Sequence, residues 1–320
     1  MRILIVSCGT RNKLIRFIKS EPKTEWVAAA DCSPYAPALY EADAYHIVPR
    51  MTDPMYLSAI LSICREDKID ALLPLQEDEL FLMAQNRAMF EKAGVTLIVS
   101  PPESVELCRD KYRFYEYLLS KDIPALKTWA DFNEFDVDYR NKKASFPVFV
   151  KPVRGCGSIG ISKVECMELL EVLSKYSKEE LLIQQLCTGD EFGADIYVDL
   201  LDGNTKEIFV KRKIRMRAGE TEKSVSYKNE ELFELIKKTV KGLSLRGPVD
   251  MDIFRMDGKF YISEINPRFG GGYPHAYGCN VNFPKLIANN ISGRVNEENI
   301  GNYDEGICMM KYQDEIIRKL

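Results

Sequence analysis

The sequence predicts a mixed α/β and α+β protein, in which an N-terminal parallel-sheet domain precedes a two-lobed module. Apolar strand-like segments alternate with helical segments over residues 1–105, which is typical of a parallel sheet covered by helices. Residues 106–186 combine a helix with strands around a glycine-rich loop, and residues 187–320 carry alternating strands joined by Asp-Gly turns. We therefore expect a Rossmann-like domain (1–105), a linker helix with a small lid subdomain (106–186) and a C-terminal antiparallel subdomain (187–320).

Hydrophobic periodicity and turn residues predict the elements of each part. In the first part, strands are expected over residues 2–7, 26–30, 71–74 and 96–99, and helices over 12–19, 55–66 and 77–93. In the second part, we expect helices over 104–120 and 167–176 and strands over 146–151, 161–164 and 181–186. In the third part, we expect strands over 194–200 and 207–214, a helix over 230–243 and a hairpin over 248–266.

The composition is that of an ordinary globular protein and argues against several classes of partner. The chain has 320 residues, 46% of them hydrophobic, and a formal net charge of −4 without an extended Lys/Arg run, so nucleic-acid binding is not expected. No apolar run approaches the ~20 residues that a membrane helix needs. The nine cysteines show no CxxC spacing, which favours reduced thiols and a cytoplasmic location. We therefore expect small molecules as partners.

A glycine-rich loop follows the strand that ends at Lys151. Gly155, Gly157 and Gly160 match GxGxxG, but the loop runs into a strand-like segment, whereas a dinucleotide-binding loop must open a helix. A hairpin loop over phosphates fits better, because glycines let backbone N–H groups approach phosphate oxygens, and Ser158 adds a hydroxyl donor. Lys151 can place its ammonium against the same phosphates. The alternative is a plain β-turn with a surface lysine.

Carboxylates gather in the predicted hairpin over residues 248–266. Asp250, Asp252, Glu264 and Asn266 provide the oxygen ligands that Mg²⁺ prefers, and they lie among apolar residues, where unpaired charge is costly. Arg268 follows, and its guanidinium can bind a carboxylate or a developing oxyanion. A metal site is the favoured interpretation, and a solvent-facing hairpin with ordinary charges is the alternative.

The register of this hairpin decides whether one metal ion can be shared. A two-residue turn at Asp257-Gly258 with regular pairing would set Met251 opposite Glu264, so that Asp252 and Glu264 point to opposite faces. A three-residue loop would instead pair Met256 with Phe260 and bring both carboxylates to one face, and a bulge would achieve the same shift. The metal hypothesis therefore requires an odd loop or a bulge.

Taken in order, these motifs resemble those of the ATP-grasp superfamily, and most of all the ATP-grasp halves of carbamoyl-phosphate synthetase large subunits. The ordered set consists of Lys111 in CRDKYRF, Lys151 with its glycine loop, the strand LIQQLCTGDEF and the carboxylate hairpin ending in EINPR. The resemblance covers essentially the whole chain. It implies an ATP-grasp fold, ATP and Mg²⁺ (or Mn²⁺) as cofactors, and a homodimer as one candidate assembly.

The resemblance also implies roles for individual residues. Lys111 and Lys151 would contact the ATP phosphates beneath the loop of Gly155, Gly157, Ser158 and Gly160. Asp252, Glu264 and Asn266 would ligate magnesium, and Arg268 would stabilise the acyl phosphate or the tetrahedral intermediate. The remaining nucleotide contacts would come from Gln184, Gln185 and Leu186 beside adenine and from Glu191 at the ribose. Two positions depart from the family pattern, because Gln184 is often acidic in relatives and Asp252 replaces a glutamine or glutamate of some of them.

Further residues are candidates for contacts with the substrate. Lys211 and Arg215 lie in a basic stretch and could face phosphate or an anionic substrate, although part of that stretch is expected to be a solvated strand edge. Ser7, Gly9 and Arg11 follow the first strand, where open α/β sheets bind ligands, or they simply lead into a helix. His275 follows the glycine triplet and is a candidate for substrate contact or for a structural role.

The implied activity is that of an ATP-dependent carboxylate–amine ligase. A carboxylate attacks the γ-phosphate of ATP, and an amine or ammonia then displaces phosphate from the acyl phosphate. Two alternatives stay open at this stage: a carbamoyl-phosphate-synthetase-like enzyme that acts on bicarbonate, and a non-catalytic nucleotide-binding protein.

Overall fold

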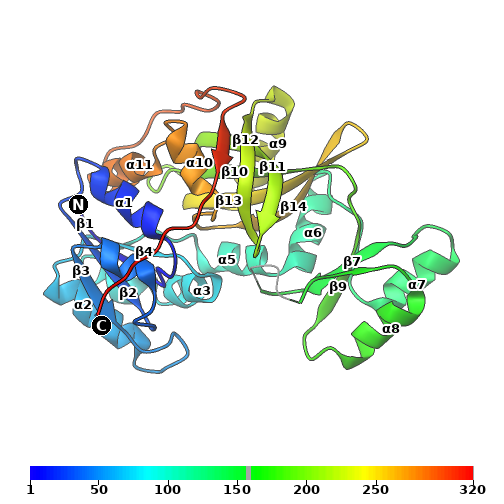
Figure 1. The fold of residues 1–320 in the computed structure, drawn as a ribbon, viewed down its shortest axis with the longest axis horizontal. Coiled ribbons are helices and arrows are strands. Elements are labelled where there is room, and N and C mark those ends of the chain that lie inside the picture. The colour runs from blue at the N-terminus through cyan, green and yellow to red at the C-terminus, as the bar shows by residue number, and fades with distance from the viewer. Residues whose placement is uncertain (156–159, 320) are drawn as a thin grey trace.

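The computed structural model describes residues 1–155 and 160–319. Within this part of the chain, the strands form three sheets of five, four and six strands (Figure 1). The five-stranded sheet is entirely parallel, and the other two are antiparallel. The predicted fold class is confirmed.

The N-terminal sheet has the strand order β3-β2-β1-β4-β5. Its strands are β1 (Arg2–Val6), β2 (Trp26–Asp31), β3 (Ala44–Ile47), β4 (Ala71–Pro74) and β5 (Thr96–Leu97). The connecting elements are α1 (Asn12–Ser20), η1 (Pro37–Glu41), α2 (Tyr56–Glu66), α3 (Glu77–Gln85) and α4 (Arg87–Glu91). The chain leaves β1 towards β2 but later returns to its other side with β4, and ligands bind at such a reversal point, beyond the carboxyl ends of the strands.

The helix predicted over residues 104–120 is two helices. They are α5 (Pro102–Arg109) and α6 (Lys111–Ser120), and the break falls at Asp110, which has an extended backbone. The Asp110 carboxylate accepts a hydrogen bond of 3.0 Å from the backbone N–H of Arg113 and so caps α6. As a consequence, Lys111 occupies the first position of a helix.

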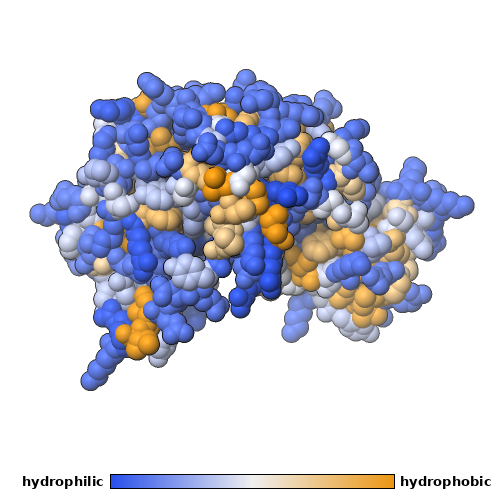
Figure 2. Space-filling model, turned by 45° about the horizontal axis from the view of Figure 1, so that its top comes forward, coloured by the Kyte–Doolittle hydropathy of each residue, from blue (hydrophilic) through white to orange (hydrophobic). Residues whose placement is uncertain are grey.

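The four-stranded sheet and two helices form a lobe at the right of Figure 1. Its strands, in the order β6-β9-β7-β8, are β6 (Thr128–Trp129), β9 (Leu181–Gln185), β7 (Val148–Pro152) and β8 (Ser162–Val164). The helices are α7 (Phe132–Arg140) and α8 (Met167–Tyr176). The lobe has its own small core around Trp129, Phe135 and Leu170. Apolar residues also gather on its outer surface (Figure 2), and they include Val137, Tyr139, Leu169, Val172 and Tyr176.

The six-stranded sheet has the order β14-β13-β10-β11-β12-β15. Its strands are β10 (Asp190–Val198), β11 (Thr205–Arg217), β12 (Glu220–Tyr227), β13 (Gly247–Met256), β14 (Lys259–Asn266) and β15 (Cys308–Met310). Helices α9 (Glu230–Lys241), α10 (Tyr273–Gly278) and α11 (Phe283–Ile291) accompany it. Strand alternation places Ala194 and Ile196 in the main apolar core with Ile236 of α9, whereas Glu191 and Asp195 point to the other face.

The end of the chain runs from the six-stranded sheet to the N-terminal domain. Residues 311–319 form no helix or strand and extend from β15 towards the N-terminal sheet (Figure 1). At the far end, the guanidinium carbon of Arg318 lies 4.0 Å from the ring centre of Tyr40. None of the described helices is long and apolar enough to cross a membrane.

Candidate active site

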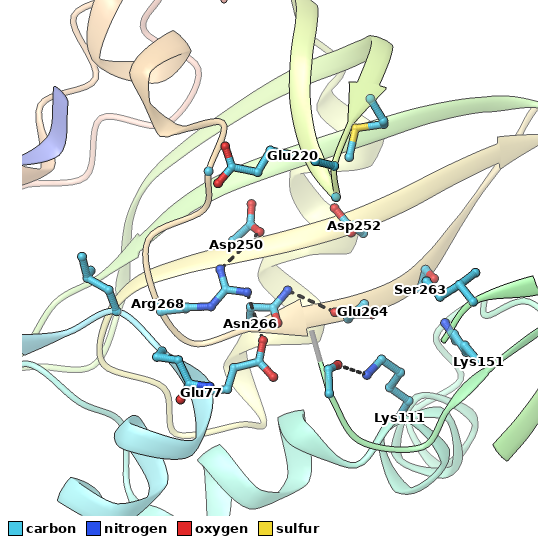
Figure 3. A pocket seen from close by; sticks show the side chains of 18 of the residues that line it. Glu77, Lys111, Lys151, Glu220, Asp250, Asp252, Ser263, Glu264, Asn266 and Arg268 are labelled. Carbon is cyan, nitrogen blue, oxygen red and sulfur yellow. Dashed lines mark hydrogen bonds and ion pairs between the residues drawn. The ribbon is translucent and has the colours of Figure 1, made fainter. Parts of the chain in front are cut away.

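A cavity of about 600 Å³, called the main cavity below, is lined by residues of all three sheets (Figure 3). The N-terminal domain contributes the segments that follow β1 and β4, which meet at the reversal point of that sheet. The small lobe contributes Lys151 and Gln184, and the six-stranded sheet contributes its charged face. The polar and charged residues of its lining include Ser7, Arg11, Glu77, Lys111, Lys151, Gln184, Glu191, Glu220, Asp250, Asp252, Glu264, Asn266 and Arg268, and Gly9 lines it as well.

The carboxylate hairpin reaches the required register by a bulge. Its turn has two residues, Asp257 and Gly258, both with positive φ, so the three-residue loop that we considered is wrong. The pairing shifts at Ser263, because Ile253 pairs with Ile262 while Asp252 pairs with Glu264. Asp252 and Glu264 therefore share one face, as the metal hypothesis requires.

The oxygen atoms at this face fit a magnesium ion that also binds phosphate. Asp252, Glu264 and Asn266 line the main cavity, and the Asn266 side-chain nitrogen lies 3.4 Å from Glu264 Oε1. Among the described residues, no three acidic, histidine or cysteine side chains are grouped closely enough to hold a metal ion by themselves. Mg²⁺ usually binds through one or two carboxylates and completes its shell with phosphates and water, so this donor set suits it.

Lys213 belongs to the site, although sequence reasoning selected Lys211 and Arg215 instead. Its ammonium lies 2.8 Å from Glu191 Oε1 and 2.6 Å from Asp252 Oδ1. Burial alone would lower the pKa of Lys213, but the two carboxylates outweigh it and raise that pKa. Lys213 thus places one positive charge between a predicted metal ligand and a predicted ribose ligand.

Gly193 makes room for this contact. Gly193 of β10 lies between Lys211 of β11 and Asp252 of β13 in the sheet. A Cβ at Gly193 would lie 3.1 Å from Lys213 Cε and 3.3 Å from Lys211 Cε, closer than most such contacts. A side chain at this position would require the two lysines to shift by a few tenths of an ångström.

Lys211 and Arg215, like Lys213, are not among the described residues that line the main cavity, but Lys213 contacts the lining residues Glu191 and Asp252. Lys211 is fully buried and forms an ion pair with Asp195 beneath the charged face. Arg215 is 63% exposed and pairs with Glu222 at 2.9 Å. The strand pairing shifts between Lys213 and Arg215, which ends the simple alternation of faces and turns Arg215 outward. The catalytic roles suggested for Lys211 and Arg215 therefore remain predictions, and Lys211 is tied to the charged face by its ion pair with Asp195.

Arg268 joins two acids at the end of the main cavity away from Lys151 (Figure 3). It lies 3.0 Å from Glu77 of α3 and 4.0 Å from Asp250 of β13. Burial and the nearby Asp252 raise the pKa of Asp250 to about 6. A Cβ at Gly270 would lie 2.3 Å from an Asp250 oxygen, so this glycine allows the loop to pass over the acid.

The small lobe contains Lys151 and Gln184, the candidates for phosphate and adenine contact. Lys151 is buried and donates to Gln184 Oε1 at 3.1 Å, while Gln184 donates to Thr128 at 3.0 Å. Burial lowers the pKa of Lys151. Lys111 donates to the carbonyl oxygen of Gly155 at 2.6 Å, which ties α6 to the start of the glycine loop.

The remaining nucleotide-site candidates differ in their relation to the main cavity. Gly157 and Ser158 fall outside the described residues. Gly160 is described, with a φ of +71°, but it does not line the main cavity. Gln185 and Leu186 also lie outside the lining, whereas Glu191 belongs to it.

The segment after β1 lines the main cavity, as predicted for Ser7, Gly9 and Arg11. Ser7 has a positive φ of 48°, and its hydroxyl donates to Glu79 at 2.9 Å. Glu79 is fully buried, and its other oxygen has no partner among the described residues. Burial raises the pKa of Glu79 to about 7.

His275 does not line the main cavity. It is buried, and its ring nitrogens lie 2.8 Å from the Ser224 hydroxyl and 3.0 Å from the Ile307 carbonyl oxygen. Burial and the charge of Lys211 lower the pKa of His275 to about 4, so it stays neutral. Of the two readings of His275, the structural one is supported.

Sequence reasoning missed Glu77, Glu220 and Lys213, and it grouped Asp250 with the metal ligands without foreseeing its pairing with Arg268. Glu77 meets Arg268 only through tertiary structure, since 191 residues separate them. Glu220 follows a turn that no predicted element contained. Only Lys213 had a signal in the sequence, because it shares strand parity with Lys211.

Comparison with known proteins shows that two segments of the chain match described families. Residues 108–272 match a family described as "ATP-grasp domain", and residues 3–98 match "PylC-like, N-terminal domain". A carbamoyl phosphate synthase large chain from Thermoplasma acidophilum is 23% identical over 253 residues, which cover 72% of this chain but 24% of that protein. The vancomycin B-type resistance protein VanB of Enterococcus faecalis is 25% identical over 306 residues, which cover 87% of this chain and 84% of that protein.

Solved structures share the fold at low identity. The biotin carboxylase domain of Hydrogenobacter thermophilus 2-oxoglutarate carboxylase, solved as a dimer with MgADP, ADP and bicarbonate, matches with a TM-score of 0.74 and 18% identity, covering 96% of this chain and 73% of that one. An N5-carboxyaminoimidazole synthetase from Staphylococcus aureus, complexed with ADP, matches with a TM-score of 0.73 and 15% identity, covering 93% of this chain and 78% of that one.

Proposed function

Because this chain belongs to the ATP-grasp family, whose characteristic cofactors are ATP and Mg²⁺, we propose that it is an ADP-forming ligase that joins a carboxylate to an amine. The observation that carries the proposal is the order of groups along the main cavity. Lys111 and Lys151 lie at one end, the oxygen ligands Asp252, Glu264 and Asn266 follow, and Arg268 lies at the other end. A nucleotide, its metal ion and an acyl group would need these groups in this order.

Each group has a task that its chemistry suits. The two lysines hold the phosphate chain of ATP, and Asp252, Glu264 and Asn266 would hold Mg²⁺, which supplies positive charge at the transferring phosphoryl group. A substrate carboxylate attacks the γ-phosphorus, so that ADP leaves and an acyl phosphate forms. Arg268 stabilises the negative charge that develops on the acyl oxygen.

The second step joins the amine to the acyl carbon. The amine nitrogen attacks that carbon, the bond to the phosphate oxygen breaks, and the nitrogen loses a proton. Asp250 is the candidate proton acceptor, because its carboxylate lies 4.0 Å from Arg268, which would bind the acyl group.

The proposal also covers the cellular location and the oligomeric state of the enzyme. We propose that it acts in the cytoplasm, since the eight described cysteines are all free thiols. We also propose a homodimer, on the ground that the biotin carboxylase domain with the same fold was solved as a dimer. Size-exclusion chromatography with light scattering tests the latter.

Hydroxylamine trapping tests the ligase assignment. Carboxylates, with bicarbonate among them, are incubated with Mg-ATP and hydroxylamine, and hydroxamate and ADP are measured. A carboxylate that yields both in equal amounts supports the proposal, and Lys151→Ala should abolish both products. ADP release with bicarbonate and ammonia alone would point to carbamoyl-phosphate chemistry, and ATP binding without ADP release from any mixture would contradict the ligase assignment.

A further inference from the structure

A second cavity of about 550 Å³ adjoins the main cavity. It is bounded by the start of α1, by the segment from Phe269 to Pro274 and by residues 311–316 of the C-terminal segment. The two cavities share four lining residues: Thr10, Arg11, Glu220 and Gly271. Among the described residues, none of the nucleotide-contact candidates lines the second cavity.

The boundary between the cavities consists of charged side chains. Glu220 lies 3.2 Å from Arg11 and 2.8 Å from Lys311, and its own side chain is 41% exposed. Burial opposes the charge of Glu220, but Arg11 and Lys311 outweigh it and lower the pKa of that acid. A Cβ at Gly271 would lie 2.7 Å from the Glu220 carboxyl carbon and 2.8 Å from an Arg11 nitrogen, so the glycine lets this cluster lie against the loop. A carboxylate at the boundary can bind an ammonium group that approaches from the second cavity.

A further part of the lining of the second cavity offers positive charge at Lys13, while Asp314 and Glu315 line the cavity as well. Lys13 lies 5.5 Å from the ring centre of Tyr312, and within the described part of the chain no carboxylate lies within ion-pair distance of its ammonium. Helix α1 begins at this part of the lining, and its N-cap residue, Arg11, makes no capping hydrogen bond through its side chain. The N-terminal end of a helix carries partial positive charge, which adds to that of Lys13.

We propose that the second cavity binds the amine substrate, and that this substrate carries an anionic group, as an amino acid does. This inference rests on the proposed ligase function. Glu220 holds the ammonium group beside the acyl end of the main cavity, and Lys13 with the start of α1 holds the anionic group. The substrate thus enters from the side opposite to ATP, so that the two reactants do not obstruct each other.

The test compares amines that differ only in the anionic group. With a carboxylate that supports hydroxamate formation, the twenty standard amino acids, their carboxamides and O-phosphoethanolamine serve as acceptors. We expect KM for the best amino acid to be about tenfold lower than for its carboxamide, as one charged contact would give. In Lys13→Glu this ratio should fall to about one, because the partner of the carboxylate is lost. A preference for O-phosphoethanolamine would assign the anion as phosphate.

Lys19→Glu provides the matched control. Lys19 lies on the same helix, but it pairs with Asp43 at 2.7 Å and does not line the second cavity, so this variant should keep the wild-type ratio. Equal KM values for acid and amide in the wild type, or an unchanged ratio in Lys13→Glu, would overturn the acceptor site. Failure of the ligase assignment itself is recognised separately, because no hydroxamate would then form with any carboxylate.

Discussion

Lys151 is the residue whose removal should affect ATP most directly. It is buried at the nucleotide end of the main cavity, and its ammonium already lies in a polar setting with Gln184. We expect Lys151→Ala to lower kcat/KM roughly 100-fold and to weaken ATP binding, because the phosphates lose a fixed positive charge. Nucleotide titration and steady-state kinetics measure both effects.

The control is Lys175→Ala, which removes an exposed lysine of the same lobe. Both variants should retain the wild-type circular dichroism spectrum. If Lys151→Ala bound ATP as tightly as Lys175→Ala does, the proposed phosphate contact would be excluded.

Glu79 should make the stability of the protein depend on pH. Its pKa is about 7 in the folded chain and 4.5 for an ordinary glutamate, so the folded state holds the proton more tightly. The contribution of Glu79 to the stability of the folded state is therefore largest below about pH 4.5 and is lost as the pH rises through about 7. Between those limits the loss is on the order of 2–3 kcal/mol.

Glu79→Gln should remove this dependence while keeping the shape of the side chain. Denaturant unfolding from pH 5 to pH 8 measures it, with the exposed Glu66→Gln as the control. Parallel pH profiles for the wild type and Glu79→Gln would show that Glu79 is ionised in the folded protein throughout.

At the residue scale, sequence motifs selected Lys111, Lys151 and Glu264, and all three line the main cavity. Lys151 came from the strand before the glycine loop and Glu264 from the carboxylate hairpin, whereas Lys111 came from the family resemblance alone. The choice of Lys211 over Lys213 shows the limit, because residues two apart on a strand share a face but differ in position along it. Only the neighbouring strands reveal which lysine reaches Asp252.

At the element scale, Gly193 is as important as the strands that it separates. We expect Gly193→Val to displace Lys211 and Lys213 from their carboxylates and to destabilise the fold by about 1–3 kcal/mol, as overpacking does. The same change should lower activity, since Lys213 holds Asp252 in place. Thermal unfolding and hydroxamate formation measure the two effects.

Gly278→Ala is the matched control, because a Cβ at Gly278 would meet no atom within 4 Å. It should unfold at the wild-type temperature or slightly above it. If Gly193→Val were as stable and as active as Gly278→Ala, the two lysines could keep their contacts with the carboxylates despite the added side chain.

The carboxylate hairpin shows how far sequence can define an element. The need for Asp252 and Glu264 to share a face was evident from burial and charge, and the structure meets it. The sequence could not decide how the hairpin brings the two carboxylates to one face, because a three-residue loop and a bulge have the same effect on the register. The structure combines the commonest turn with a bulge at Ser263, whose side chain also lines the main cavity.

At the scale of the whole molecule, the fold class and the order of the three parts were predictable, whereas the contacts between them were not. Strand and helix periodicities are local properties, but the pairing of Arg268 with Glu77 depends on how the N-terminal domain meets the six-stranded sheet. Likewise, the second cavity exists only because the C-terminal segment crosses to α1.

Five carboxylates of the site share three cations before any metal ion binds. Asp195 pairs with Lys211, Asp252 and Glu191 share Lys213, and Arg268 lies between Glu77 and Asp250; the ion pairs are all internal to the chain. We therefore expect EDTA to change the free energy of unfolding by less than about 1 kcal/mol, since metal binding to the protein alone adds little. Differential scanning calorimetry with EDTA, with Mg²⁺ and with Mg-ATP measures this.

Only the Mg-ATP sample should unfold at a clearly higher temperature, because ligand binding to the folded state raises its stability. A fall of many degrees on chelation would mean that the carboxylates depend on the metal ion for their stability.

The contact that Lys213 makes with Asp252 past Gly193 has a consequence for the stability of the enzyme in a cell that lacks magnesium. A protein that carries its own counter-ion does not need its metal ion in order to be made, folded or stored. Magnesium shortage would then leave the enzyme idle but intact, and renewed supply of the ion and the nucleotide would restart it without new protein synthesis.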